Sequence, residues 1–140
     1  MSRVRAFCIV GVLLLLAGSA GAQTPADRQA IQGAIAAQLD AFRRDDGPAA
    51  FAFATPELRS MFRSPERFMD MVREGYRPVY RPHSVAFGTL TPLGPHLVQR
   101  VEVVGPDGQP RVALYYMIQD AAGVWRIDGC ELTDSDAVGT

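Results

Sequence analysis

Apolar segments in the second half of the chain are joined by connections of only a few residues. Gly105–Gly108 and Asp120–Gly123 are rich in Gly, Pro and Asp, which favour turns. Connections this short join antiparallel neighbours, because parallel strands need crossovers of about a dozen residues or more. The sequence therefore predicts an antiparallel meander of four strands, in the segments 85–89, 97–104, 112–119 and 123–132.

The pairing of these strands determines which face of the sheet is buried. If Val104 faces Arg111 and Gln119 faces Val124, one strongly apolar face results, and this face must meet the helices. It would contain Leu97, Gln99, Val101, Val103, Val112, Leu114, Tyr116, Ile118, Trp125 and Ile127. The opposite face would be mixed, with Val98, Arg100, Glu102, Tyr115, Met117, Arg126, Asp128 and Cys130.

Helices are expected in the first half of the mature chain. A hydroxyl residue precedes Pro at Thr24-Pro25, Thr55-Pro56 and Ser64-Pro65, the pattern of a capping side chain followed by Pro at the first helical position. The first helix, over 25–45, carries an apolar stripe at helical spacing, formed by Ile31, Ile35, Leu39 and Phe42. By contrast, Tyr76–Pro82 is expected to be extended, because its two prolines disfavour a helix. The predicted fold class is α+β, with N-terminal helices packed on the sheet in a single domain over residues 23–140.

The start of the chain has the parts of a secretory signal peptide. Arg3 and Arg5 give a positive start, 7–17 is an apolar run, and Ala20-Gly21-Ala22 matches a small-x-small cleavage pattern. The alternative is an uncleaved anchor helix, but the run is shorter than the ~20 apolar residues that a membrane span requires. We therefore expect 1–22 to be removed. The mature chain would be periplasmic or secreted, with no stable membrane insertion.

Composition excludes several classes of function. Removal of Arg3 and Arg5 would leave 12 arginines against 15 acidic residues, so no basic surface for nucleic acid is expected. The chain contains no Lys, which excludes Schiff-base chemistry. Cys130 would be the one remaining thiol: a buried apolar side chain, a free thiol or half of an intermolecular bridge. Without His-x-x-x-His or Cys-x-x-Cys spacing, neither a metal site nor a cofactor is expected.

Candidate site residues follow from the predicted pocket between the helices and the sheet. The ligand-binding candidates are Tyr76 and Tyr80 at the mouth, with Gln99, Tyr116 and Trp125 on the inner face of the sheet. The structural alternative is that Gln99 satisfies a backbone group and that the tyrosine hydroxyls reach solvent. No catalytic residue is assigned, because no pair of titratable side chains converges on the pocket.

Short motifs spread over most of the mature chain carry a resemblance to known proteins. They are Ala41-Phe42, Asp45-Asp46, Phe53-Ala54-Thr55-Pro56, Leu58-Arg59, Phe62, Ser64-Pro65-Glu66, Phe68, Met71-Val72, Tyr76, Pro78-Val79-Tyr80, Gln99 and Trp125-Arg126-Ile127-Asp128-Gly129-Cys130. On these motifs the chain resembles a family of short exported bacterial proteins catalogued as a domain of unknown function. That family is similar to the nuclear-transport-factor-2-like, or cystatin-like, cone superfamily. The resemblance implies a cone-shaped α+β fold but no activity, because one fold hosts many functions.

The expected function is therefore that of an exported binding module. Its partner would be a small apolar molecule or another envelope protein, held in or near the helix–sheet pocket. One alternative is an enzyme of the isomerase or hydratase kind, which would need an acid–base residue in the pocket. The other is a structural domain that forms a homodimer through the mixed face of the sheet.

Overall fold

The computed structural model describes residues 23–134, and the predicted leader over 1–22 lies outside the described residues. The helices are α1 (Pro25–Arg43), α2 (Gly47–Ala52), α3 (Pro56–Phe62), α4 (Pro65–Gly75) and α5 (Arg77–Tyr80). The strands are β1 (Ser84–Leu93), β2 (His96–Val104), β3 (Pro110–Gln119) and β4 (Trp125–Asp134). The strands form one antiparallel sheet in the order β1-β2-β3-β4, so the predicted α+β class and the meander are confirmed.

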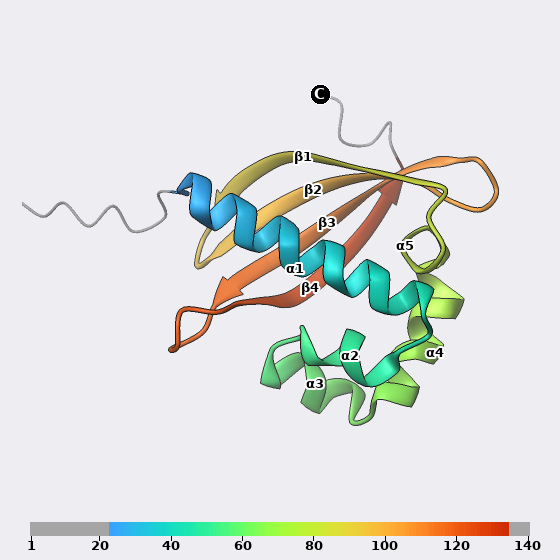
Figure 1. Cartoon of the computed structure of the whole chain (residues 1–140), viewed down its shortest axis with the longest axis horizontal. Helices are drawn as coiled ribbons and strands as arrows, with labels where there is room; N and C mark the ends of the chain where they lie inside the picture. Colours follow the sequence, from blue (N-terminus) through green and yellow to red (C-terminus); the bar gives the residue numbers. More distant parts are fainter. Residues whose placement is uncertain (1–22, 135–140) are drawn as a thin grey trace, which may run out of the picture.

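The helices cover one face of this curved sheet. α1 runs across that face, and the shorter helices α2, α3 and α4 lie together beyond the β4 side (Figure 1). The segment between α2 and α3 is tied directly to β4: Ile127 N donates to Phe53 O at 2.9 Å, and Thr55 N donates to Ile127 O at 2.9 Å. This pairing fixes the short helices against the sheet.

All three predicted helix caps are present. Thr24 and Asp27 form a capping box at the start of α1, Thr55 Oγ1 accepts from Leu58 N at 3.2 Å, and Ser64 Oγ accepts from Arg67 N at 3.2 Å. Each cap satisfies an N–H group that has no partner inside its own helix. The predicted stripe of α1 is also correct, because Ile31, Ile35, Leu39 and Phe42 are all buried.

The extended conformation predicted for Tyr76–Pro82 is wrong over its central residues. Arg77–Tyr80 forms the one-turn helix α5, in which Tyr80 N donates to Tyr76 O and Arg81 N donates to Arg77 O, both at 2.9 Å. Pro78 lies in the first turn, where the missing N–H costs no hydrogen bond, and Pro82 follows the end of the helix. Two prolines four residues apart are thus compatible with a single turn.

The predicted pairing of β3 is displaced by one residue at both turns. Val103, not Val104, faces Arg111, and Gln119 faces Trp125, not Val124. A one-residue displacement exchanges the two faces of a strand. As a result Ala113, Tyr115 and Met117 point into the core, whereas Leu114, Tyr116 and Ile118, which were predicted to be internal, are only partly buried.

A β-bulge in β4 then changes the face of the residues that follow it. Tyr116 pairs with Gly129 and Met117 pairs with Ile127, so Asp128 is an extra residue on β4. Because a bulge shifts the alternation of side chains, Ile127 and Cys130 both face the helices. The prediction that Cys130 lies on the outer face is therefore wrong.

Candidate functional site

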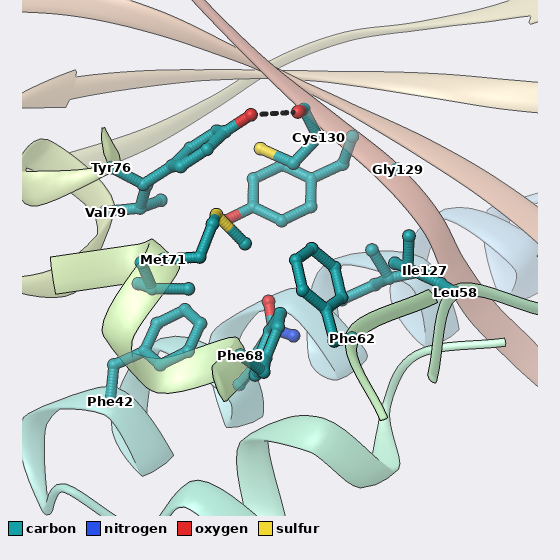
Figure 2. A pocket seen from close by; sticks show the side chains of 13 residues that line it. Phe42, Leu58, Phe62, Phe68, Met71, Tyr76, Val79, Ile127, Gly129 and Cys130 are labelled. Carbon is teal, nitrogen blue, oxygen red and sulfur yellow. Dashed lines mark hydrogen bonds between the residues drawn. The ribbon is translucent and has the colours of Figure 1, made fainter. Parts of the chain in front are cut away.

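A cavity of about 350 Å³ lies between the helices and the β3–β4 half of the sheet. Its walls come from α1, α3, α4, α5, β3 and β4, as Figure 2 shows from close by. The lining residues are Gln38, Phe42, Leu58, Phe62, Phe68, Met71, Val72, Tyr76, Val79, Tyr115, Ile127, Gly129 and Cys130. Small-molecule sites in proteins are usually cavities of this size, formed mainly by apolar side chains.

One end of the cavity is formed by a cluster of phenylalanines. The Phe68 ring centroid lies 6.0 Å from that of Phe42 and 5.5 Å from those of Phe51 and Phe62. The rings are tilted or edge-on to one another, the arrangements that aromatic pairs prefer. These contacts join α1, α2, α3 and α4. The apolar end is therefore held by residues from four separate helices.

Hydrogen-bonding groups gather at the other end. The Tyr76 hydroxyl donates to Cys130 O at 2.9 Å, and the Cys130 thiol points into the cavity (Figure 2). Burial raises the pKa of the Cys130 thiol to about 12, with a smaller opposing effect from its hydrogen bond to Tyr115. Burial likewise raises the pKa of Tyr115 well above its usual value, and that of Tyr76 to a lesser extent. All three side chains are thus neutral at pH 7.

Gln38 adds an amide to the lining. Its side chain is buried, and Nε2 donates to Ala50 O at 3.1 Å, which fixes the orientation of the amide. Within the described residues, those that line the cavity include no Asp, Glu, His or Arg. The cavity thus offers neutral hydrogen-bonding groups and an apolar surface, with no charged group on its wall.

Comparison with known proteins gives one match. Residues 24–140 match the family described as a domain of unknown function (DUF4864). The chain belongs to this family. No match was found among curated proteins, and none was found among solved structures. In this member of the DUF4864 family, none of the helices within residues 23–134 is long and apolar enough to span a membrane.

The five predicted ligand-binding residues lie in different places. Tyr76 lines the cavity, whereas Tyr80, Gln99, Tyr116 and Trp125 do not. Tyr80 lies at the end of α5, where its hydroxyl donates to the Asp45 carboxylate and its ring lies 4.0 Å from the Arg81 guanidinium. Gln99 is fully buried, and its Nε2 donates to Gly88 O at 3.1 Å and Arg100 O at 2.8 Å.

The other two residues, Tyr116 and Trp125, lie outside the cavity for different reasons. The Tyr116 hydroxyl donates to Glu131 Oε2 at 2.8 Å on the outer face, because β3 is displaced by one residue from the predicted pairing. Trp125 packs against the core, and its Nε1 donates to Asp27 Oδ1 at 3.4 Å near the start of α1.

Several cavity residues were missed because their position depends on tertiary structure. Tyr115 and Cys130 were predicted to lie on the outer face, and the aromatic cluster of the helices was not assigned to a site. One sequence signal was present: an isolated Gly within a strand, here Gly129, indicates a bulge. Applied to β4, that signal would have placed Cys130 on the inner face.

A second polar cluster lies on the opposite face of the sheet. His96 Nε2 lies 2.8 Å from Asp128 Oδ2, and the Thr55 hydroxyl donates to Asp128 Oδ1 at 2.8 Å. The His96 ring meets the Tyr116 ring edge-on at 6.1 Å. Within residues 23–134, no group of three or more His, Cys, Asp and Glu side chains is arranged to hold a metal ion. The contacts of Asp128 link β2, β4 and the start of α3.

Proposed function

We propose that this DUF4864 chain is a binding module that holds one small, largely apolar molecule in the cavity. The observation that carries the proposal is the cavity itself: about 350 Å³ with phenylalanines at one end and neutral hydrogen-bonding groups at the other. Cavities of this kind, with a few convergent polar groups, are the usual sites of small ligands. Tyr76, Tyr115 and Cys130 are the residues proposed to contact the polar part of the ligand.

The same lining favours binding over catalysis. An isomerase or hydratase needs a carboxylate or imidazole that can move a proton at the substrate. The described residues that line the cavity offer tyrosines and a thiol whose pKa values are raised by burial. The pair formed by His96 and Asp128 lies on the far side of the sheet. The enzyme alternative therefore receives less support than the binding module.

Export and superfamily membership complete the proposal. We expect the binding module to work in the periplasm or outside the cell, because residues 1–22 have the pattern of a signal peptide. The long helix α1 across one face of a curved meander is compatible with a nuclear-transport-factor-2-like cone (Figure 1). Capture of an envelope protein and formation of a homodimer through the outer face of the sheet are the alternative proposals.

Native mass spectrometry of the purified mature protein, followed by a denatured run, tests the binding proposal. A bound small molecule should appear as added mass that is lost on denaturation. In the variant Leu58→Trp, which places an indole in the cavity, the added mass should disappear. Met61→Trp is the matched control, because Met61 is 73% exposed on the same helix and lies outside the lining. A ligand-free dimer in the wild type would count against the proposal and favour the dimerisation alternative.

A further inference from the structure

The two ends of the cavity differ in chemistry. Tyr76 and Cys130 lie at one end in Figure 2, and Phe42, Phe62 and Phe68 lie at the other. The Tyr76 hydroxyl donates to Cys130 O, so its oxygen remains an acceptor, while the Tyr115 hydroxyl and the Cys130 thiol are hydrogen-bonded to each other, which leaves one of their two protons free to donate. A molecule in the cavity therefore meets two hydroxyls and a thiol at one end and aromatic rings at the other. The Gln38 amide, one turn from Phe42 on α1, is held by its hydrogen bond to Ala50 O.

Three arginines around the cavity, Arg73, Arg81 and Arg126, form ion pairs outside its lining. Arg81 Nη2 lies 2.9 Å from Asp45 Oδ2, and Arg73 Nη2 lies 3.6 Å from Asp45 Oδ1. On the β4 side, Arg126 Nε lies 3.3 Å from Asp120 Oδ2. None of these residues is among the described residues that line the cavity. A buried anion would thus have no cation on the wall with which to pair.

The energetic consequence differs greatly between charged and neutral ligands. Moving an ionised carboxylate out of water without a partner remains strongly unfavourable even after relaxation of the protein. A neutral hydroxyl or carbonyl group costs far less, and a hydrogen bond inside the cavity offsets most of that cost. The lining therefore favours a neutral ligand over an ionised one.

We infer that the cavity selects an electrically neutral molecule with an apolar body and one hydroxyl or carbonyl end, and that it rejects the corresponding free acid. The polar end lies beside Tyr76, Tyr115 and Cys130, and the apolar body lies against the phenylalanines. This inference rests on the proposed binding function and names the class of ligand for the same site.

Competition with a neutral fluorescent probe tests this selectivity. The mature protein is first mixed with N-phenyl-1-naphthylamine, and 1-decanol, methyl decanoate or decanoate, which share one chain and differ in the end group, is then added as a competitor. We expect the alcohol and the ester to displace the probe at concentrations at least tenfold lower than decanoate at pH 7.5. Equal or stronger displacement by decanoate would overturn the inference.

The remaining outcomes separate this inference from the proposed function. If the probe binds and none of the three compounds displaces it, the ligand class is wrong while the binding function stands. If neither the probe nor any of the three compounds binds, the proposed function fails together with the inference.

A charge placed on the wall provides the matched variant. Met71→Arg adds a cation beside the cavity, and its partly exposed position allows the long side chain to keep contact with water. We expect the preference for decanol over decanoate to fall at least tenfold in this variant. Met61→Arg, on the exposed side of α3, should leave the preference unchanged. An unchanged preference in both variants, each shown to be folded by circular dichroism, would contradict charge selection at this cavity.

Discussion

Cys130 shows how strongly one residue depends on its surroundings. Its thiol points into the apolar cavity, and burial raises its pKa to about 12. The thiolate, not the thiol, is the nucleophile in alkylation, so a raised pKa makes the native thiol unreactive. The sequence left open whether Cys130 is buried, free or bridging, and its position against Tyr115 in the core favours the buried form.

We predict that iodoacetamide alkylates Cys130 slowly in the folded protein. The thiolate fraction falls tenfold for each unit by which the pKa exceeds the pH, so the folded rate should still rise tenfold per unit between pH 8 and pH 10. In urea, the exposed thiol should have an ordinary pKa of about 8.5 and a rate that levels off above pH 9. The measurement is a mass-spectrometric time course at each pH. A folded rate that levels off near pH 9 would contradict a buried thiol.

At the residue scale, the role of a side chain could be predicted from the sequence where its contacts are local. Thr24, Thr55 and Ser64 could be assigned as caps because a cap contacts a backbone N–H only three residues away. Gln99 was predicted to be internal, but its partners Gly88 and Thr89 belong to an irregular part of β1 that the sequence does not reveal. Local contacts follow from the sequence, whereas the partner of a buried amide follows from the whole sheet.

At the scale of elements, the start of α3 is held by more than a cap. Thr55 Oγ1 accepts from Leu58 N and also donates to Asp128 Oδ1 at 2.8 Å, so one hydroxyl joins α3 to β4. Leu58 and Phe62 of this helix line the cavity. The Thr55 side chain therefore adds to the backbone pairing with Ile127 in holding this wall of the cavity against β4.

We predict that Thr55→Ala destabilises the protein more than Ser64→Ala does. Loss of an N-cap costs about 1 kcal/mol, and loss of a hydrogen bond to a charged group adds about 1.5–3 kcal/mol. Ser64 caps α4 through the hydrogen bond that its hydroxyl accepts from Arg67 N, and serves as the matched control. Urea unfolding followed by circular dichroism measures both variants. Equal losses of stability would mean that the contact between Thr55 and Asp128 contributes nothing.

The register of the sheet marks the limit of prediction at this scale. Strand existence and order followed from the turns, but a one-residue error at Gly105–Gln109 and at Asp120–Val124 reversed the faces of β3. The bulge at Asp128 then moved Cys130 to the inner face. Two apolar residues in succession, as at Val112-Ala113, fit either face, so hydrophobic alternation alone did not identify the correct register.

At the scale of the molecule, the fold class was predictable and the cavity lining was not. Helices that precede a meander predict the α+β class. The short turns restrict the topology of the sheet to antiparallel neighbours. The lining combines α1, α3, α4, α5, β3 and β4, so it depends on the packing of the short helices against one end of the sheet. Of the five predicted ligand-binding residues, Tyr76 lines the cavity: it lies between α4 and α5, and its hydroxyl donates to Cys130 O.

The central claim is that the cavity is a binding site for a neutral apolar molecule, and a titration of N-phenyl-1-naphthylamine tests it most directly. Fluorescence should rise to saturation at one probe per chain in the wild type and in Met61→Trp. Leu58→Trp should weaken binding at least tenfold, because its indole occupies the cavity. Saturation of all three proteins with the same affinity, or no binding to the wild type, would contradict the claim.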